Sequence, residues 1–337
     1  MSLPLVSIVV PLYNEESNLP ALYDRLSRVA SELKEFYNFE FLLVNDGSRD
    51  ESWRTIAALA KHDNRIRGIS FSRNFGKELA ITAGYDHAVG DAIITMDSDL
   101  QHPPEFIPKL LSAWVEGFDI VYTRNAEHYE SRFKKVAAFL HYKLLDAVSS
   151  VHIPSYVQDF RLTDKKVIEV LRHSREKARY LRGMVAWTGF SYTCIDVLYE
   201  KRFKGTSAFS FIQLLKISFD GLTGFSLFPL RIASYIGVFV IATGSAMLAY
   251  LSVRAFLFAP LHYWLFKCLV AIIYIFLGVL FILVWLLGEY IGRIYEEIKG
   301  RPLYVVANTV NMQDNGAERT LPLVNYKKPF SRENCTC

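Results

Sequence analysis

Two glycine-rich phosphate-binding signatures are missing from this chain of 337 residues. No G-x-G-x-x-G follows a strand-like run and no G-x-x-x-x-G-K-[ST] occurs, so the sequence has neither a dinucleotide fingerprint nor a P-loop. Any phosphate group bound by this protein is therefore expected to be held in another way. A divalent cation that bridges a diphosphate is the other common arrangement.

Cysteine is scarce and charge is nearly balanced. The spacing of the four cysteines, Cys194, Cys268, Cys335 and Cys337, fits neither a zinc site nor a disulfide framework, which favours free thiols in a reducing compartment. The formal net charge of +4 is mild and gives no indication of nucleic-acid binding. The N-terminus lacks a basic region followed by a cleavage site, so no signal peptide is expected.

Charge is also absent from two long stretches in the second half of the chain. Residues 232–252 and 268–288 contain no charged side chain, and each is long enough to cross about 30 Å of hydrocarbon as a helix. A buried core helix of this length would normally show a polar face, so we predict a hairpin of two transmembrane helices, at about 232–252 and 266–288. Basic residues flank the hairpin, which predicts a multi-pass protein of the plasma (inner) membrane with both termini cytoplasmic.

The first part of the chain alternates strand-like and helix-like segments. The strand-like runs are Leu5–Val10, Phe39–Val44, Ile66–Phe71, Ala92–Met96 and Asp119–Tyr122. Patterns typical of helices, such as residues 19–36 and 50–62, lie between them. This alternation predicts an α/β domain whose mostly parallel sheet is covered by helices on both faces. In such sheets, ligands bind outside the carboxyl ends of the strands.

Residues 131–150 combine an apolar helical face with basic side chains, among them Arg132 and Lys134. The pattern fits an amphipathic helix at a membrane interface, or an ordinary amphipathic helix packed on the domain. Phe209–Phe225 is a second, more apolar candidate that leads into the first predicted span.

Carboxylates follow the predicted strands. Glu15, Asp46, and the pair Asp97 and Asp99 would meet at one edge of a parallel sheet, where their mutual repulsion requires a compensating group. Side chains at positions i and i+2 of a strand face the same way, so Asp97 and Asp99 can converge on one Mg²⁺ or Mn²⁺ ion. The alternative is that Asp99 only begins the turn before His102.

Six motifs occur in order: VSIVVPLYNEESNL, LLVNDGSRDES, SFSRNFGKE, MDSDLQHPPE, QDFRL and LGEYIGRIYEEIKGRPLY. Together they resemble the polyisoprenyl-phosphate glycosyltransferases, which are inverting family 2 enzymes with a GT-A fold and include the bactoprenol glucosyltransferases and dolichol-phosphate mannose synthase. The resemblance covers residues 5 to about 305. It implies a GT-A nucleotide-sugar-binding part (1–130), a remainder of the catalytic domain with interfacial helices (131–228), two transmembrane helices (229–290) and a cytoplasmic extension (291–337).

The resemblance implies transfer of a sugar from a nucleoside diphosphate to a polyprenyl phosphate, with Mg²⁺ or Mn²⁺ as cofactor. Metal binding would fall to Asp97, Asp99 and Gln101. The residues implied in nucleotide-sugar binding are Pro11, Tyr13, Glu15, Asp46, Arg73, Lys77, Asp97 and Ser98.

Asp159, in QDFRL, corresponds to the family position near the reacting sugar and is the candidate catalytic residue. A phosphomonoester has a second pKa of about 6 and needs no strong base. Asp159 is therefore expected either to orient the sugar and acceptor or to remove a proton. The alternative is a loop residue that caps a helix beginning near Thr163.

The acceptor phosphate requires cations at the membrane, and the candidates are Arg124, Arg132, Lys134 and Arg202. Contact with lipid head groups, or simple solvation, is the alternative for each. Many family members carry R-x-x-G-x-S-K-Y in this region, whereas this chain has RFKGTSAF, with Ala208 and Phe209 in place of Lys and Tyr. This departure weakens a role of the loop in acceptor binding.

The two-span hairpin favours the bactoprenol glucosyltransferase branch, and therefore glucose from UDP-glucose and undecaprenyl phosphate. GDP-mannose, UDP-N-acetylglucosamine and a modified pentose remain open as donors. A processive polysaccharide synthase is disfavoured because the chain lacks Q-x-x-R-W, and a non-catalytic nucleotide-sugar-binding scaffold is disfavoured because the clustered acids are retained. A homo-oligomer, a tetramer by resemblance, is expected.

Overall fold

The computed structural model describes residues 3–125, 154, 157–177, 179–197 and 264–312, together with several residues between 235 and 253. The chain divides into two compact units. The first unit contains the sheet and the helices packed on it. The second contains the long helix α10 (Trp264–Ile298).

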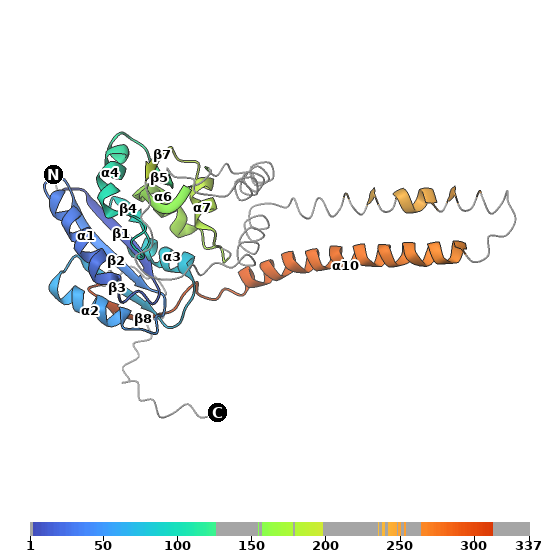
Figure 1. The fold of residues 1–337 in the computed structure, drawn as a ribbon, viewed down its shortest axis with the longest axis horizontal. Helices are drawn as coiled ribbons and strands as arrows, with labels where there is room; N and C mark the ends of the chain where they lie inside the picture. Colours follow the sequence, from blue (N-terminus) through green and yellow to red (C-terminus); the bar gives the residue numbers. More distant parts are fainter. Residues whose placement is uncertain are drawn as a thin grey trace, which may run out of the picture. The chain divides into compact units, whose positions relative to one another are not determined.

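The described part of the first unit is built on an eight-stranded sheet with the order β7-β5-β6-β4-β1-β2-β3-β8 (Figure 1). Its strands are β1 (Leu5–Leu12), β2 (Asn38–Asn45), β3 (Ile66–Phe71), β4 (Ala92–Thr95), β5 (Ile120–Asn125), β6 (Val157–Asp164), β7 (Tyr192–Val197) and β8 (Val306–Val310). Strands β3, β2, β1 and β4 are parallel, β6 is antiparallel to β4 and β5, β7 is parallel to β5, and β8 is antiparallel to β3. All strands except β6 and β8 run in one direction, which confirms the predicted mostly parallel sheet.

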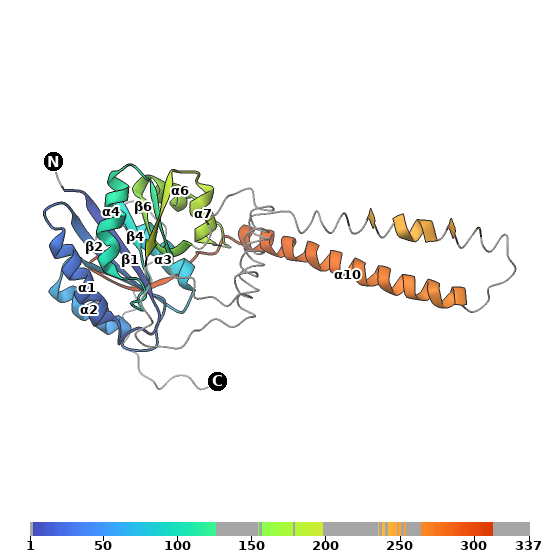
Figure 2. The same cartoon turned by 45° about the horizontal axis from the view of Figure 1, so that its top comes forward.

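Helices cover both faces of this sheet (Figure 2). They are α1 (Leu19–Glu32), α2 (Ser52–His62), α3 (Lys77–His87), the 3₁₀ turn η1 (Pro104–Phe106), α4 (Ile107–Val115), α6 (Lys165–His173) and α7 (Leu181–Trp187). On one face, alternate β1 residues such as Ile8 and Val10 pack with α1, α2 and α4. On the other face, Val44 and Ile69 pack with α3. Burial on both faces explains why these strands read as continuous apolar runs in the sequence.

Some predicted boundaries were wrong. Strand β1 continues past Val10 because its ladder with β2 extends to Leu12. Pro11 is compatible with this strand because β4 pairs with β1 only as far as Val9, so that β1 has a strand partner on one side there. Strand β4 ends at Thr95, one residue before its predicted end, and the first helix ends at Glu32 rather than at residue 36.

The strand order has one reversal that positions the site. From β1 the chain moves outward through β2 and β3, then returns to β4 on the opposite side of β1. The carboxyl ends of β1 and β4 therefore flank a topological switch point, which is where open α/β sheets bind ligands. The segments that leave β1, β2 and β4 there begin at Tyr13, Asp46 and Met96.

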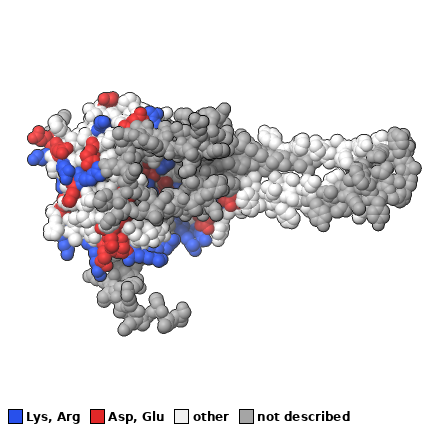
Figure 3. Space-filling model, viewed as in Figure 1, with Lys and Arg blue, Asp and Glu red and all other residues white. Residues whose placement is uncertain are grey.

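Helix α10 covers the second predicted span, and its segment Ile275–Ile298 is long and apolar enough to cross a membrane by length and composition. Away from its C-terminal end, the described atoms of α10 are drawn white in Figure 3, and large apolar side chains such as Phe281 are exposed. In the first predicted span, the described residues are helical. The rest of that span, the predicted helix 131–150 and Phe209–Phe225 lie outside the described residues.

After α10 the chain returns to the sheet, which the sequence did not predict. Tyr304 stacks on Phe71 at 4.9 Å between ring centroids, and its hydroxyl donates to Asp86 Oδ2 at 2.9 Å. Strand β8 then pairs with β3 and completes one edge of the sheet.

Candidate active site

The loops that follow β1 and β2 are joined by reciprocal hydrogen bonds. The backbone N–H of Asn14 donates to Ser48 Oγ at 2.9 Å, and that of Arg49 donates to Asn14 Oδ1 at 2.9 Å. The N–H of Glu15 donates to Ser52 Oγ at 3.0 Å. These bonds fix the two loops to each other, so the predicted nucleotide residues Tyr13 and Glu15 lie on a rigid platform.

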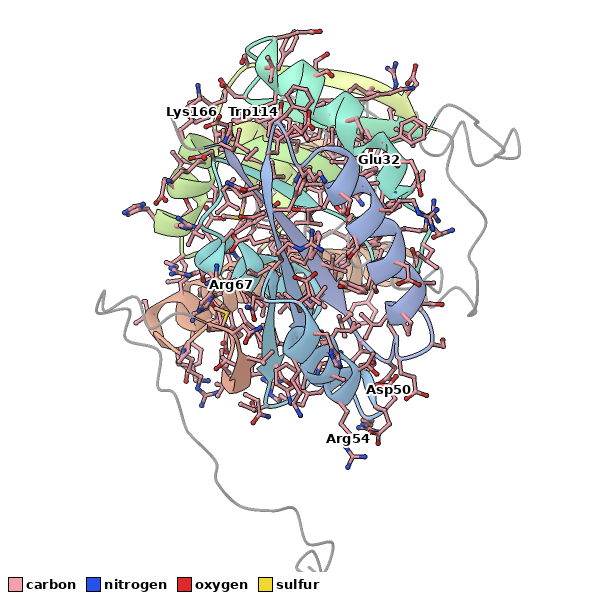
Figure 4. The ribbon with its side chains drawn as sticks, turned by 90° about the vertical axis from the view of Figure 1, so that its left-hand side faces the viewer. Glu32, Asp50, Arg54, Arg67, Trp114 and Lys166 are labelled. Carbon is pink, nitrogen blue, oxygen red and sulfur yellow. The ribbon has the colours of Figure 1, made fainter. Side chains whose placement is uncertain are left out.

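This platform lies at the carboxyl edge of the sheet. Figure 4 shows Asp50, which follows β2, at one end of the domain, and Trp114 and Lys166 at the opposite end. Trp114 Nε1 donates to Asp164 Oδ2 at 2.7 Å, which ties α4 to the end of β6 at that other edge. The predicted ligand-binding residues after β1, β2 and β4 thus share one edge of the molecule.

Asp46 organises the neighbouring loop. Its Oδ1 accepts from the Phe75 N–H at 2.6 Å and its Oδ2 from the Gly76 N–H at 2.9 Å. Burial raises the pKa of this carboxyl, and the two N–H groups oppose that rise. Gly47, at φ +63°, lies so close to this loop that a Cβ would be 2.3 Å from the Arg73 carbonyl carbon. Asp46 was predicted to bind the nucleotide sugar; in the structure its two oxygens hold the loop that leads into α3.

Four charged side chains contact one another in series, in the order Asp97, Lys77, Asp159 and Arg182. We call them the Asp97–Arg182 network. Lys77 Nζ, from the first turn of α3, lies 2.6 Å from Asp97 Oδ1 and donates to Asp159 Oδ2 at 2.8 Å. Arg182 Nε, from α7, donates to Asp159 Oδ1 at 2.8 Å. Behind them, the fully buried Arg161 places Nη1 4.0 Å from the same oxygen. The Asp97–Arg182 network brings together Lys77, Asp97 and Asp159, all of which the sequence predicted at the site.

The protonation states of the residues in the Asp97–Arg182 network follow from their contacts. Burial alone would raise the pKa of Asp159, but Arg182 and Lys77 together hold it well below its usual range. Burial disfavours the charged form of Lys77, yet Asp97 and Asp159 outweigh burial and raise the pKa of the ammonium. Burial and the charge of Asp159 raise the pKa of Glu78, which accepts from the Leu181 N–H at 3.2 Å. Asp159 is therefore an anion held between cations.

The geometry around Asp97 and Asp99 differs from the predicted one. Because β4 ends at Thr95, the two residues lie in a turn and the strand rule for positions i and i+2 does not apply to them. Asp99 Oδ1 accepts from the Gln101 N–H at 3.1 Å, which is the local turn expected as the alternative. The intervening Leu100 has a φ of +63°.

His102 supports the other side of this turn. Its Nδ1 accepts from the Asp97 N–H at 2.9 Å, and its ring stacks on Phe160 at 5.3 Å. Burial lowers the pKa of His102 and favours the neutral ring that accepts this bond. The position of Asp97 is thus fixed from β6 as well as from its own loop.

The residues of this turn fit a hard cation. Asp97, Asp99 and Gln101 carry side-chain oxygens on one short segment, and Mg²⁺ and Mn²⁺ are commonly held by one or two carboxylates together with water and substrate phosphates. No group of three or more His, Cys, Asp and Glu side chains with metal-binding geometry occurs among the described residues. A metal at this turn would therefore complete its coordination with water and ligand oxygens.

The remaining candidates lie in varied settings. Ser98 is buried, and the guanidinium of Arg73 lies 4.0 Å from the ring centre of Phe75. Arg124, a predicted acceptor-binding residue, forms an ion pair with Asp196 of β7 at 2.7 Å. The other predicted acceptor-binding residues, Arg132, Lys134 and Arg202, lie outside the described residues.

Sequence reasoning missed Arg182, Glu78 and His102. No motif marks Arg182, which reaches Asp159 from α7, a helix that packs on α6. Glu78 and His102, in contrast, lie within two of the six motifs. The alternative that Asp159 is a helix-capping loop residue is wrong, because Asp159 lies inside β6 and Asp164 caps α6 by accepting from the Lys166 N–H at 2.9 Å.

Comparison with known proteins identifies the family. Residues 7–172 match the family described as Glycosyl transferase family 2. The chain is 40% identical over 310 residues to "Uncharacterized glycosyltransferase YkcC" of Bacillus subtilis (strain 168), which covers 91% of this chain and 95% of that protein. The chain belongs to glycosyltransferase family 2.

The chain has two further similarities to known proteins. This family 2 glycosyltransferase is 38% identical over 302 residues to the "Bactoprenol glucosyl transferase" of Shigella phage SfII, with 89% of this chain and 97% of that protein covered. Among solved structures, mannosyl-3-phosphoglycerate synthase from Rubrobacter xylanophilus gives a TM-score of 0.44 at 15% identity, over 64% of this chain and 71% of that one. The latter is a weak likeness of fold.

Proposed function

We propose that this glycosyltransferase transfers a sugar from a nucleoside diphosphate to a polyprenyl phosphate, with glucose, UDP-glucose and undecaprenyl phosphate as the first candidates. The observation that carries the proposal is the similarity to bactoprenol glucosyl transferases, which extends over 89% of the chain and so is not confined to the nucleotide-binding part. The apolar helix α10 supports an acceptor that resides in a membrane.

The donor would bind at the switch point of the sheet. Tyr13 and Glu15 on the joined loops would contact the nucleoside, and Asp97, Asp99 and Gln101 would hold Mg²⁺ or Mn²⁺. Such an ion supplies charge neutralisation for a departing diphosphate. Arg73 and Lys77, which border the same edge, would face the diphosphate or the sugar. The described contacts of Lys77 with Asp97 and Asp159 support this placement.

The reaction is proposed as a direct displacement with inversion. An oxygen of the acceptor phosphate forms a bond to the anomeric carbon, while the bond from that carbon to the diphosphate breaks and its electron pair leaves with the nucleoside diphosphate. The acceptor phosphate has a second pKa of about 6 and is largely dianionic at neutral pH. Asp159, whose pKa is depressed, is a poor proton acceptor and is proposed to orient Lys77 and Arg182 toward the reacting groups.

Acceptor binding and assembly complete the proposal. Arg124, Arg132, Lys134 and Arg202 are proposed to contact the acceptor phosphate or nearby lipid head groups. The protein is proposed to span the inner membrane twice within residues 229–290, with the catalytic part and both termini in the cytoplasm, and to form a homo-oligomer, with a tetramer as the first candidate.

The proposal can be tested by transfer of radiolabelled sugar into an organic-extractable lipid. Purified full-length protein would receive undecaprenyl phosphate, Mg²⁺ or Mn²⁺, and UDP-glucose, GDP-mannose, UDP-N-acetylglucosamine or a nucleotide pentose, one at a time. Label entering the lipid from UDP-glucose alone supports the whole proposal, and label from another donor replaces only the sugar.

Two other outcomes support different functions. Label in a long, lipid-free polymer would indicate a processive synthase. Binding of a nucleotide sugar without any transfer would indicate a non-catalytic scaffold. Asp159→Asn serves as the control for contaminating activity, because it should abolish transfer.

A further inference from the structure

The shared position of Lys77 leads to an inference about the order of ligand binding. We propose that Lys77 pairs with Asp97 as a replaceable cation. The metal ion displaces Lys77 from Asp97, and the diphosphate oxygens of the donor then accept hydrogen bonds from the Lys77 ammonium. Metal and nucleotide would then each strengthen the binding of the other through this one side chain. The inference rests on the proposed function, because it takes Asp97 as a metal ligand.

The contacts of Lys77 define the exchange. Its Nζ lies 2.6 Å from Asp97 Oδ1 and 2.8 Å from Asp159 Oδ2, so one ammonium contacts two carboxylates, one from the segment after β4 and one from β6. The Lys77 side chain is 42% exposed, whereas that of Asp159 is 11% exposed and is also held by Arg182. The mobile partner of this arrangement is therefore Lys77, and the fixed partner is Asp159.

Metal binding alone would be opposed by Lys77. A metal ion on Asp97 would compete with the Lys77 ammonium for the same carboxylate. Two cations that contact one carboxylate also repel each other. Breaking the contact between Lys77 and Asp97 without offering a new partner would leave a partly buried ammonium with fewer hydrogen-bond acceptors. The ion pair between Lys77 and Asp97 therefore weakens the binding of a metal ion when no nucleotide is present.

A diphosphate removes that cost. Its oxygens offer acceptors to Lys77, and a lysine ammonium can reorient its three donors on a flexible stem without leaving Asp159. The charges also balance, because the phosphate groups of a nucleotide sugar bring negative charge that offsets the added divalent cation. The exchange therefore favours joint binding over binding of either ligand alone.

Arg182 provides a matched comparison within the same cluster. It carries the same charge as Lys77 and contacts the same carboxylate of Asp159, but within the described part of the chain its ion pair is with Asp159 and not with Asp97. General electrostatics predicts that removal of either cation strengthens metal binding by a similar factor. Exchange at Asp97 predicts a large effect for Lys77 alone.

The test measures Mn²⁺ binding to the detergent-solubilised full-length protein by electron paramagnetic resonance, with and without UDP, and with GDP in parallel. We expect UDP or GDP to strengthen Mn²⁺ binding to the parent by a factor of about 10 or more, within the range of typical couplings. Lys77→Gln should strengthen binding of Mn²⁺ alone several-fold and reduce the coupling by a similar factor, so that only the coupling from direct contact between Mn²⁺ and the diphosphate remains. Lys77→Arg and Arg182→Gln should keep most of the coupling.

Two results would overturn the inference. The first is an unchanged Mn²⁺ affinity and an unchanged coupling in Lys77→Gln, with Lys77→Arg showing the variant site to be intact. The second is an equal gain of Mn²⁺ affinity in Arg182→Gln, which would show a general charge effect. A parent protein that binds neither Mn²⁺ nor nucleotide would overturn the proposed function and this inference together. A parent that transfers sugar while Lys77→Gln keeps full coupling would overturn this inference alone.

Discussion

Asp159 is held on both sides, with Arg182 Nε 2.8 Å from Oδ1 and Lys77 Nζ 2.8 Å from Oδ2. These partners come from α7 and α3, so the carboxylate joins two helices across the end of β6. A carboxylate with both oxygens occupied in this way has a fixed orientation. Its role in the proposed reaction is therefore expected to depend on the cations beside it.

The first prediction concerns Arg182. Arg182→Gln removes one of the two cations that orient Asp159 and should lower kcat by about 10- to 100-fold with little change in KM for the donor, because a small misplacement at a reacting centre carries this cost. Steady-state kinetics of the purified variant would measure it. Arg182→Lys restores the charge but not the guanidinium geometry and should recover part of the loss, whereas a normal kcat in Arg182→Gln would contradict the positioning role.

The pH profile of transfer tests whether Asp159 stays ionised over the working range. The pKa of Asp159 in the folded protein lies below the pKa of about 3.9 of an unfolded Asp. The carboxylate is therefore charged at every pH above about 3.9, and it loses its charge only at lower pH. Between pH 5 and 8, kcat/KM should show one acid limb near pH 6, which belongs to the acceptor phosphate. Two protonations on the acid side would indicate that a protein group must also be deprotonated.

Gly47 should be intolerant of a side chain for two reasons. Its φ of +63° disfavours any L-residue, and a Cβ would meet the Arg73 backbone at 2.3 Å. Gly47→Ala should lower both the melting temperature and the affinity for nucleotide. The backbone conformation alone should lower the free energy of unfolding by about 1–3 kcal/mol, and the close contact of the Cβ should lower it further. Gly117→Ala is the control, because Gly117 has a φ of +104° and a Cβ there would meet nothing within 4 Å among the described residues. The control should lose stability but retain nucleotide affinity.

The metal hypothesis predicts separate effects on activity and stability. Asp99→Ala removes the turn-forming bond from the Gln101 N–H, and loss of that bond should cost about 1 kcal/mol of stability. Its transfer rate should fall at least about 100-fold, since loss of a metal that stabilises a leaving group costs several kcal/mol of barrier. Transfer at the parental rate in the presence of a chelator would exclude the metal. The comparison needs a thermal melt and the radiolabel assay on the same preparation.

The sequence predicted the architecture where one physical signal dominated. Apolar runs bounded by polar clusters located the strands that form the parallel centre of the sheet, because a strand buried on both faces has few alternatives. The long uncharged stretch from residue 268 likewise predicted the region of α10. The family was identified from its motifs, and the similarity to known relatives confirmed it.

Local side-chain pairing was harder to predict. The compensating cation for the carboxylates was expected to be a metal ion, yet Lys77 and Arg182 already contact Asp97 and Asp159. Arg182 is brought to the site by the packing of α7, a contact that no spacing in the sequence encodes. The sequence left a metal ligand and a turn residue open for Asp99, and the strand rule that would pair it with Asp97 does not apply because β4 ends at Thr95. The position of a strand end thus decided which local rule applied.

The return of the chain to β3 has a consequence for biosynthesis. Val310 pairs with Gly68 across more than two-thirds of the sequence, and Tyr304 covers Phe71. Until residues 301–310 leave the ribosome, β3 has an unpaired edge and Phe71 lacks its stacking partner. The sheet can therefore close only after α10 has been synthesised, and a chain truncated before residue 301 would present an open strand edge that favours aggregation.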